Sequence, residues 1–176
     1  MKPFAILRDL PTDLTWEEMD AGAISNLINM AMPESDRAIA WEPRVLGVRW
    51  IRTYWEQGTN WATCLYTAPN EAAVKDWHDL CQVAYAGIRD IEVVESPEAA
   101  SDYPRGFHQP GDEAPLVVVE TDAAADQPAP DGWIRTYRDP ATGREIQLFR
   151  ADAALPADPT GAVIRRVVEL RPQDYD

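Results

Sequence analysis

The sequence predicts an α+β protein, and three observations support this fold class. Over residues 1–96, segments with strand and helix patterns follow in the order strand, helix, strand, strand, helix, strand. The stretch from Trp50 to Ala68 recurs without gaps from Trp133 to Ala151, with eight identical positions out of 19. Both copies have two alternating arms around a polar turn, which is the pattern of a β-hairpin. The order predicts a ferredoxin-like βαββαβ unit, in which both helices cover one face of an antiparallel sheet.

The first strand and the first helix are expected before residue 34. A short apolar segment from Phe4 to Arg8 ends before Pro11 and predicts a strand. Thr15 and Glu18 have the spacing of a capping box, in which hydroxyl and carboxylate each satisfy a backbone N–H group. The helix that begins there has one apolar stripe, formed by Met19, Ile24, Leu27, Ile28 and Ala31.

The central hairpin and the second helix follow. Strands are expected at 45–55 and 61–67, around a turn that contains Gly58. Simple alternation places Trp50, Arg52 and Tyr54 on one face of the sheet. Asn70 is a favourable N-cap for a helix that closes at 87, and residues 88–95 are expected to form the fourth strand.

Residues 97–176 predict a second, helix-poor unit. Strands are expected at 116–121, in the repeated hairpin and at 162–170, with proline-containing loops where the first unit has helices. Four strands without helices do not cover both faces of a sheet. We therefore expect this related β unit to pack on the unit formed by 1–96 and not to fold independently.

Composition and charge exclude several classes of protein. The net charge of −14 argues against binding to nucleic acid or to an anionic membrane, and it suits either a cationic ligand or simple solubility. The chain has no run of 18 apolar residues and no signal-peptide pattern. Two cysteines do not make a disulfide framework, so a cytoplasmic location is expected.

His78 and Cys81 form the candidate metal site. They lie three residues apart and therefore on one face of the predicted helix. Imidazole nitrogen and thiolate sulfur suit nickel, copper or zinc, although further ligands would have to complete the site. The alternative places Cys81 in the core and His78 on the helix surface. Two other histidine pairings are open: Cys64 as a nucleophile with His78 as its base, and His108 beside Asp112 and Glu113 as a loop metal site.

A second candidate site is an apolar ligand cavity. Aromatic side chains between sheet and helices could hold a flat hydrophobic ligand, and the alternative is ordinary core packing. The residues proposed to line this cavity are Trp50, Arg52, Tyr54, Trp61 and Trp77.

The first 96 residues resemble a family of small ferredoxin-like bacterial proteins, one branch of which is described as nickel-binding. Four motifs carry the resemblance: Thr53-Tyr54, Cys64-Leu65-Tyr66, Ala68-Pro69-Asn70-Glu71, and His78 with a shift of one residue. The resemblance implies a ferredoxin-like fold, nickel or another transition metal as the ligand, and a homodimer.

Three functions are therefore open. The first is non-catalytic binding of a nickel-like transition metal at His78 and Cys81. The second is a dimeric α+β-barrel enzyme or ligand-binding module that uses the tryptophan-lined cavity. The third is a structural or interaction protein. Whether the chain catalyses a reaction is left open by the sequence.

Overall fold

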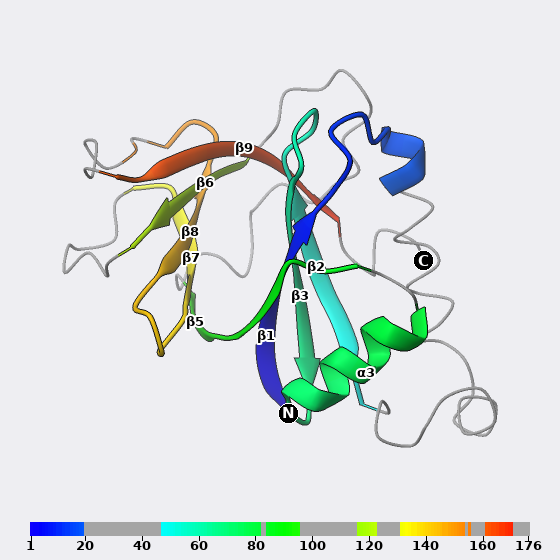
Figure 1. The fold of residues 1–176 in the computed structure, drawn as a ribbon. Helices are drawn as coiled ribbons and strands as arrows, with labels where there is room; N and C mark the ends of the chain where they lie inside the picture. The colour runs from blue at the N-terminus through cyan, green and yellow to red at the C-terminus, as the bar shows by residue number, and fades with distance from the viewer. Residues whose placement is uncertain are drawn as a thin grey trace. The chain divides into compact units, whose positions relative to one another are not determined.

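The computed structural model describes residues 1–19, 47–81, 84–95, 116–122, 131–153, 155 and 161–170. The chain divides into two compact units. The first comprises Met1–Asp90 with Leu170–Asp176, and the second comprises Ile91–Glu169. Antiparallel strands dominate the described part of both units (Figure 1). No helix of the described residues is long and apolar enough to cross a membrane.

The first unit has four antiparallel strands in the order β4-β1-β3-β2. Helix α3 lies across one face of these strands (Figure 1), and Tyr66 of β3 contacts Trp77 of α3 with ring centroids 5.4 Å apart. The elements are β1 (Lys2–Asp9), β2 (Arg49–Trp55), β3 (Trp61–Ala68), α3 (Glu71–Cys81) and β4 (Gly87–Asp90).

Local signals in the first unit act as the sequence predicts. The backbone N–H of Thr15 donates to the Glu18 carboxylate at 2.9 Å, and the N–H of Glu18 donates to the Thr15 hydroxyl at 3.2 Å, which completes the capping box. Asn70 caps α3 by accepting the Ala73 N–H at 2.9 Å. Gly58 lies in the hairpin turn with a φ of 76°, a conformation that favours glycine. Beyond Met19, the predicted first helix lies outside the described residues.

A β-bulge in β2 overturns the predicted alternation. The pairing runs from Trp50 opposite Tyr66 to Arg52 opposite Leu65, so one extra residue is inserted in β2. Residues that pair directly share a face of the sheet. Trp50 therefore lies on the face of Tyr66, whereas Arg52 lies on the opposite face. Sequence alternation cannot reveal this shift, because an inserted residue leaves the polar and apolar pattern unmarked.

The second unit has five antiparallel strands in the order β9-β6-β8-β7-β5. A core cluster of Val117, Val119 and Phe149 lies in this unit, with Trp133 packed against it. The β7-β8 hairpin repeats the bulge, between Trp133 and Arg135. The strands are β5 (Glu92–Glu95), β6 (Leu116–Thr121), β7 (Trp133–Arg138), β8 (Glu145–Arg150) and β9 (Val163–Leu170).

The predicted fold class, a ferredoxin-like α+β unit followed by a related helix-poor unit, is wrong. The described residues are mainly antiparallel β-structure, with nine strands and α3 as their one helix longer than a turn. The segment expected to be a single fourth strand is also divided at Ile91. Its first half, β4, pairs with β1, and its second half, β5, pairs with β7. Local residue patterns predict the strands themselves, whereas the division at Ile91 depends on the pairing of β5 with β7, which lies far along the chain.

Candidate functional site

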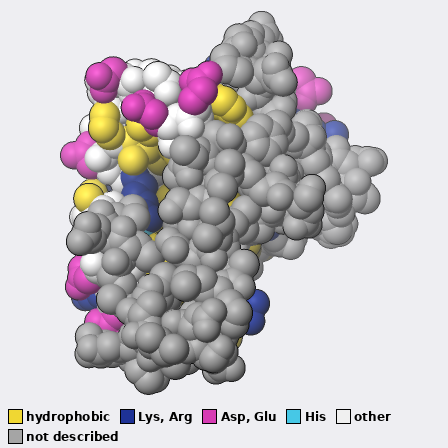
Figure 2. Space-filling model, turned by 90° about the vertical axis from the view of Figure 1, so that its right-hand side faces the viewer, with side chains coloured by type: hydrophobic (Ala, Val, Ile, Leu, Met, Phe, Trp, Pro, Cys, Tyr) yellow, Lys and Arg dark blue, Asp and Glu magenta, His cyan; other side chains and the backbone are white. Residues whose placement is uncertain are grey.

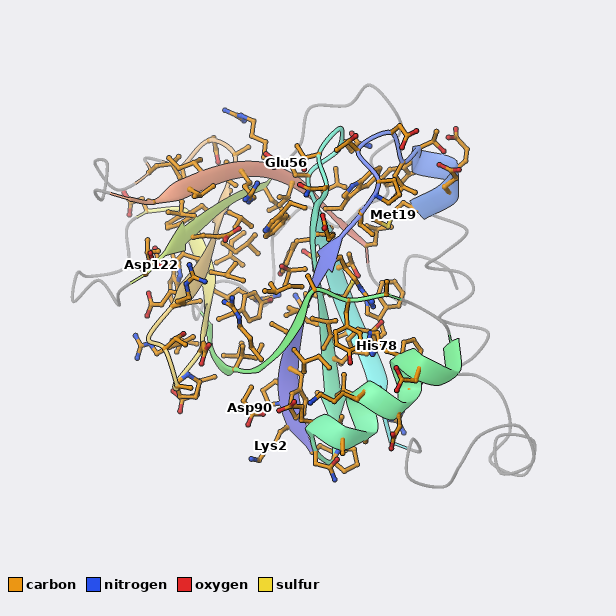
Figure 3. All side chains as sticks on the ribbon, in the orientation of Figure 1. Lys2, Met19, Glu56, His78, Asp90 and Asp122 are labelled. Atoms are coloured by element: carbon orange, nitrogen blue, oxygen red, sulfur yellow. The ribbon has the colours of Figure 1, made fainter. Side chains whose placement is uncertain are left out.

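Helix α3 places His78 on its buried side. The side chain is 1% exposed, and Ala73, Val74 and Trp77 on the same side are equally inaccessible. Figure 3 shows His78 on the side of α3 that faces the strands. The interpretation of His78 as a residue of the helix surface is therefore wrong.

Both ring nitrogens of His78 are engaged. Nδ1 lies 2.7 Å from the carbonyl oxygen of Val74, and Nε2 lies 2.8 Å from Nη2 of Arg8. A carbonyl only accepts and a guanidinium only donates, so these partners assign the proton to Nδ1. Nδ1–H donates to Val74, and the lone pair of Nε2 accepts from Arg8. The imidazole is therefore held as one neutral tautomer.

Arg8 links His78 to Cys64 and to the end of the helical segment. It lies on β1 and is 7% exposed. Nη1 donates to the carbonyl of Ala84 at 2.6 Å, and Nε donates to Sγ of Cys64 at 3.5 Å. Cys64 also accepts a hydrogen bond from the Thr53 hydroxyl at 3.1 Å. A single buried cation thus joins β1, β3 and α3.

The electrostatics of this cluster oppose a proton on His78. Burial, together with the positive charge of Arg8, lowers the pKa of His78 to about 4, and the hydrogen bond to Val74 offsets part of this effect. Burial alone would lower the pKa of Arg8, but its interactions with Cys64 and Tyr66 outweigh burial and raise that pKa above its ordinary value. At neutral pH the cluster therefore contains a charged guanidinium and a neutral imidazole.

Aromatic rings surround the imidazole. The rings of Tyr66, Trp77 and Tyr85 have centroids 5.5, 5.0 and 5.2 Å from that of His78, each in an edge-to-face orientation. Such an apolar wall keeps water away and makes the polar contacts inside it stronger. The arrangement holds a nitrogen donor and a sulfur donor around one positive charge in a dry site.

Among the side chains that the structure describes, His78 is brought together with Cys64. Among the described residues, no group of three or more His, Cys, Asp or Glu side chains is arranged to hold a metal ion. The side chain of Cys81 is not among those described. His108, Asp112 and Glu113 also lie outside the described residues. His78 shares Arg8 with Cys64, the cysteine expected to lie in the core, and the pair of His78 and Cys81 stays a prediction.

The residues proposed for the ligand cavity do not share one face. The bulge places Trp50 on the side of the sheet that carries Tyr66 and α3, where Trp77 also lies. Arg52 and Tyr54 pair with Leu65 and Thr63 and lie on the opposite face. Trp61, at the start of β3, belongs to that opposite face by alternation. Trp50 and Trp77 are fully buried, so they act as core residues of the first unit.

Sequence reasoning missed Arg8 and Thr53. A signal for Arg8 is present, because it directly follows the apolar run Phe4-Ala5-Ile6-Leu7 and alternation places it on the face of Phe4 and Ile6. A charge on the inward face of a buried strand needs buried partners. Thr53 carried no such signal. Its inward position depends on the bulge, which also lets its hydroxyl accept from Nε1 of Trp50 at 3.0 Å.

Comparison of the two hairpins shows which contacts support the bulge and which occur at the candidate site. Nε1 of Trp133 donates to the Thr136 hydroxyl at 3.0 Å, as Trp50 does to Thr53. Through the shared register, however, Gln147 takes the place of Cys64. Thr121 likewise takes the place of Arg8. The tryptophan–threonine bond therefore supports the bulge in both hairpins, whereas the described strands of the second unit have no counterpart of Arg8 and Cys64.

Comparison with known families identifies a match to the first part of the chain. A family model described as "Nickel responsive protein SCO4226-like" matches residues 4–91, which is half of the chain and covers β1 to β4. The matched region includes all the residues of the cluster around Arg8. No curated protein and no solved structure matches the chain.

Proposed function

The chain belongs to the SCO4226-like family of nickel-responsive proteins, and from this premise we propose that it binds nickel or a similar transition metal without catalysing a reaction. The ligands in this proposal are His78 and Cys64. The pair predicted from the sequence, His78 and Cys81, has the same histidine but a different cysteine. The observation that carries the choice is the shared contact with Arg8, which places both donors around one cation.

The donor types fit such a metal. Neutral imidazole nitrogen and cysteine sulfur are ligands that nickel, copper and zinc accept, and affinity among these metals depends on geometry as well as on the metal. The carbonyl of Ala84 also contacts Arg8 and adds an oxygen that is already directed toward a positive charge. In the described arrangement, Arg8 occupies the lone pair of Nε2. His78 therefore donates to a metal only after Arg8 has released it.

The charge of the whole chain supports a cationic ligand. The net charge is −14, and a negative surface raises the local concentration of cations. Figure 2 shows Asp and Glu side chains at several separate places on the described surface. The free thiol of Cys64 also fits a reducing compartment such as the cytoplasm, because thiols there stay available as ligands.

The state of His78 supports the non-catalytic part of the proposal. A general base needs a nitrogen that reaches a substrate proton. His78 is 1% exposed, and both of its nitrogens are bonded inside the protein. These contacts argue against proton transfer between His78 and a substrate in solution.

Nickel titration of the purified, tag-free protein tests the proposal. We expect wild type to bind nickel in a fixed ratio to chains, measured by calorimetry and by native mass spectrometry, which also reports whether the protein is the proposed homodimer. His78→Ala should abolish this binding and Cys64→Ser should weaken it. Cys81→Ser is the matched control and should bind like wild type. Loss of binding in Cys81→Ser with intact binding in Cys64→Ser would restore the His78 and Cys81 pair. Unchanged binding in His78→Ala would overturn the site altogether.

A further inference from the structure

We infer that Arg8 is an internal competitor of the metal, so that release of its guanidinium from His78 sets the metal affinity of this site. The inference rests on the proposed function and adds its regulation. It begins from an unusual contact: the nitrogen best suited to a metal, Nε2 of His78, accepts its hydrogen bond from a permanent cation at 2.8 Å. A metal ligand is more commonly supported by a carboxylate or a carbonyl than blocked by a guanidinium.

Because both are positively charged, the Arg8 guanidinium and a metal ion cannot contact Nε2 of His78 at the same time. A guanidinium keeps its proton throughout the ordinary pH range. A second cation at the same nitrogen would meet that charge at short range, in a buried site where screening by water and salt is weak. The lone pair on Nε2 also has room for one partner alone. Metal ligation and the Arg8 contact are therefore alternative states of one site.

The same exchange reaches a second element. Arg8 holds the carbonyl of Ala84 at 2.6 Å, in the connection between α3 and β4. The next bond along, from the Ala86 N–H to the Leu7 carbonyl at 2.8 Å, is made by backbone alone and does not depend on Arg8. Withdrawal of Arg8 therefore frees the connection at Ala84 while β4 stays paired. This gives the site a way to report its occupancy at the protein surface, because Ala84 is exposed.

Substitution of Arg8 tests the competition. Arg8→Met keeps much of the length of the side chain and removes its charge, and we expect it to bind nickel at least about tenfold more tightly than wild type. Arg8→Lys retains the charge and should show no such gain. Arg49→Met is the matched control: Arg49 is exposed on β2, where solvent screens its charge, so the same change there should leave affinity unaltered. Equal or weaker nickel binding in Arg8→Met, with the His78→Ala loss intact, would overturn the inference.

A measurement on wild type covers the case in which Arg8→Met fails to fold. Zinc serves as a diamagnetic probe of the same donors. In a ¹⁵N-labelled sample, the side-chain Nε–H resonance of Arg8 is assigned by its loss in Arg8→Lys. We expect this resonance to be protected from exchange with water in the free protein and to lose that protection when zinc is added. Retained protection in the zinc-saturated protein would contradict the release of Arg8.

The outcomes separate this inference from the function on which it rests. If neither nickel nor zinc binds to wild type or to Arg8→Met, the proposed function fails. If metal binds through His78 and Cys64 while Arg8 keeps its contacts, the function stands and the competition is wrong. If Arg8→Met alone binds metal, the site exists and Arg8 suppresses it, which supports the inference.

Discussion

At the scale of single residues, the pair of Arg8 and His78 shows how a buried site fixes a protonation state. The Val74 carbonyl accepts from Nδ1–H, and the arginine donates to Nε2, so the contact with Arg8 requires the neutral ring. Placing a proton on Nε2 would set two positive groups against each other in an apolar surrounding. Protonation of His78 at low pH therefore carries a free-energy penalty in the folded chain.

This penalty predicts a specific loss of stability at low pH. The pKa of His78 is about 4 in the folded chain, against an ordinary value of 6.5, so the unfolded chain takes up the proton first. The free energy of unfolding should be fully retained above pH 6.5, fall as the pH decreases toward 4, and lose no more from this residue below that. Because each pKa unit corresponds to about 1.4 kcal/mol, the total is on the order of 3 kcal/mol.

Urea unfolding at several pH values measures this loss. The difference between wild type and His78→Gln isolates the histidine, since the two proteins differ at this side chain alone. We expect wild type to lose its advantage over the variant between pH 6.5 and 4. A difference that stays constant across this window would show that His78 is not held neutral by burial and Arg8.

At the scale of elements, short-range signals were readable in the sequence and registers were not. The capping box at Thr15, the N-cap at Asn70 and both hairpins follow from residue types at fixed spacing. The bulge after Trp50 depends on how two strands pair, which is a contact between distant residues. It moved Thr53 inward and divided the proposed cavity. The site was half predictable for the same reason: His78 was identified on α3, but its partners come from β1 and β3.

The bulges predict unequal effects for two equivalent threonines. In Thr53→Val, the buried indole N–H of Trp50 loses its acceptor, which should lower the free energy of unfolding by about 1–3 kcal/mol. In Thr136→Val, the indole of Trp133 is half-buried and regains water, so a loss of about 1 kcal/mol or less is expected. Equilibrium unfolding in urea of the two variants provides the comparison. Equal losses would mean that burial of the tryptophan does not set the cost.

At the scale of the whole molecule, the order along the chain and the grouping in space differ. The first unit joins residues 1–90 with the chain from Leu170 onward, and the second unit begins at Ile91. Leu170 is 3% exposed, so a strand end from the last tenth of the sequence belongs to the buried part of the protein. The predicted boundary at residue 96 falls just beyond β5, which pairs with β7.

This grouping predicts that residues 1–96 do not fold well alone. The fragment retains β5 without its partner β7, and Val93 and Val94 would then lie on an unpaired strand. An unpaired apolar strand edge promotes association between chains. We expect the fragment to aggregate or to unfold without a cooperative transition, and co-expression with residues 97–176 to restore solubility because β7 is then supplied in trans. Size-exclusion chromatography and thermal unfolding decide the matter. A soluble, cooperatively folded monomer of 1–96 would show that the matched family region is self-sufficient, and the second unit would then be an addition to it rather than a requirement.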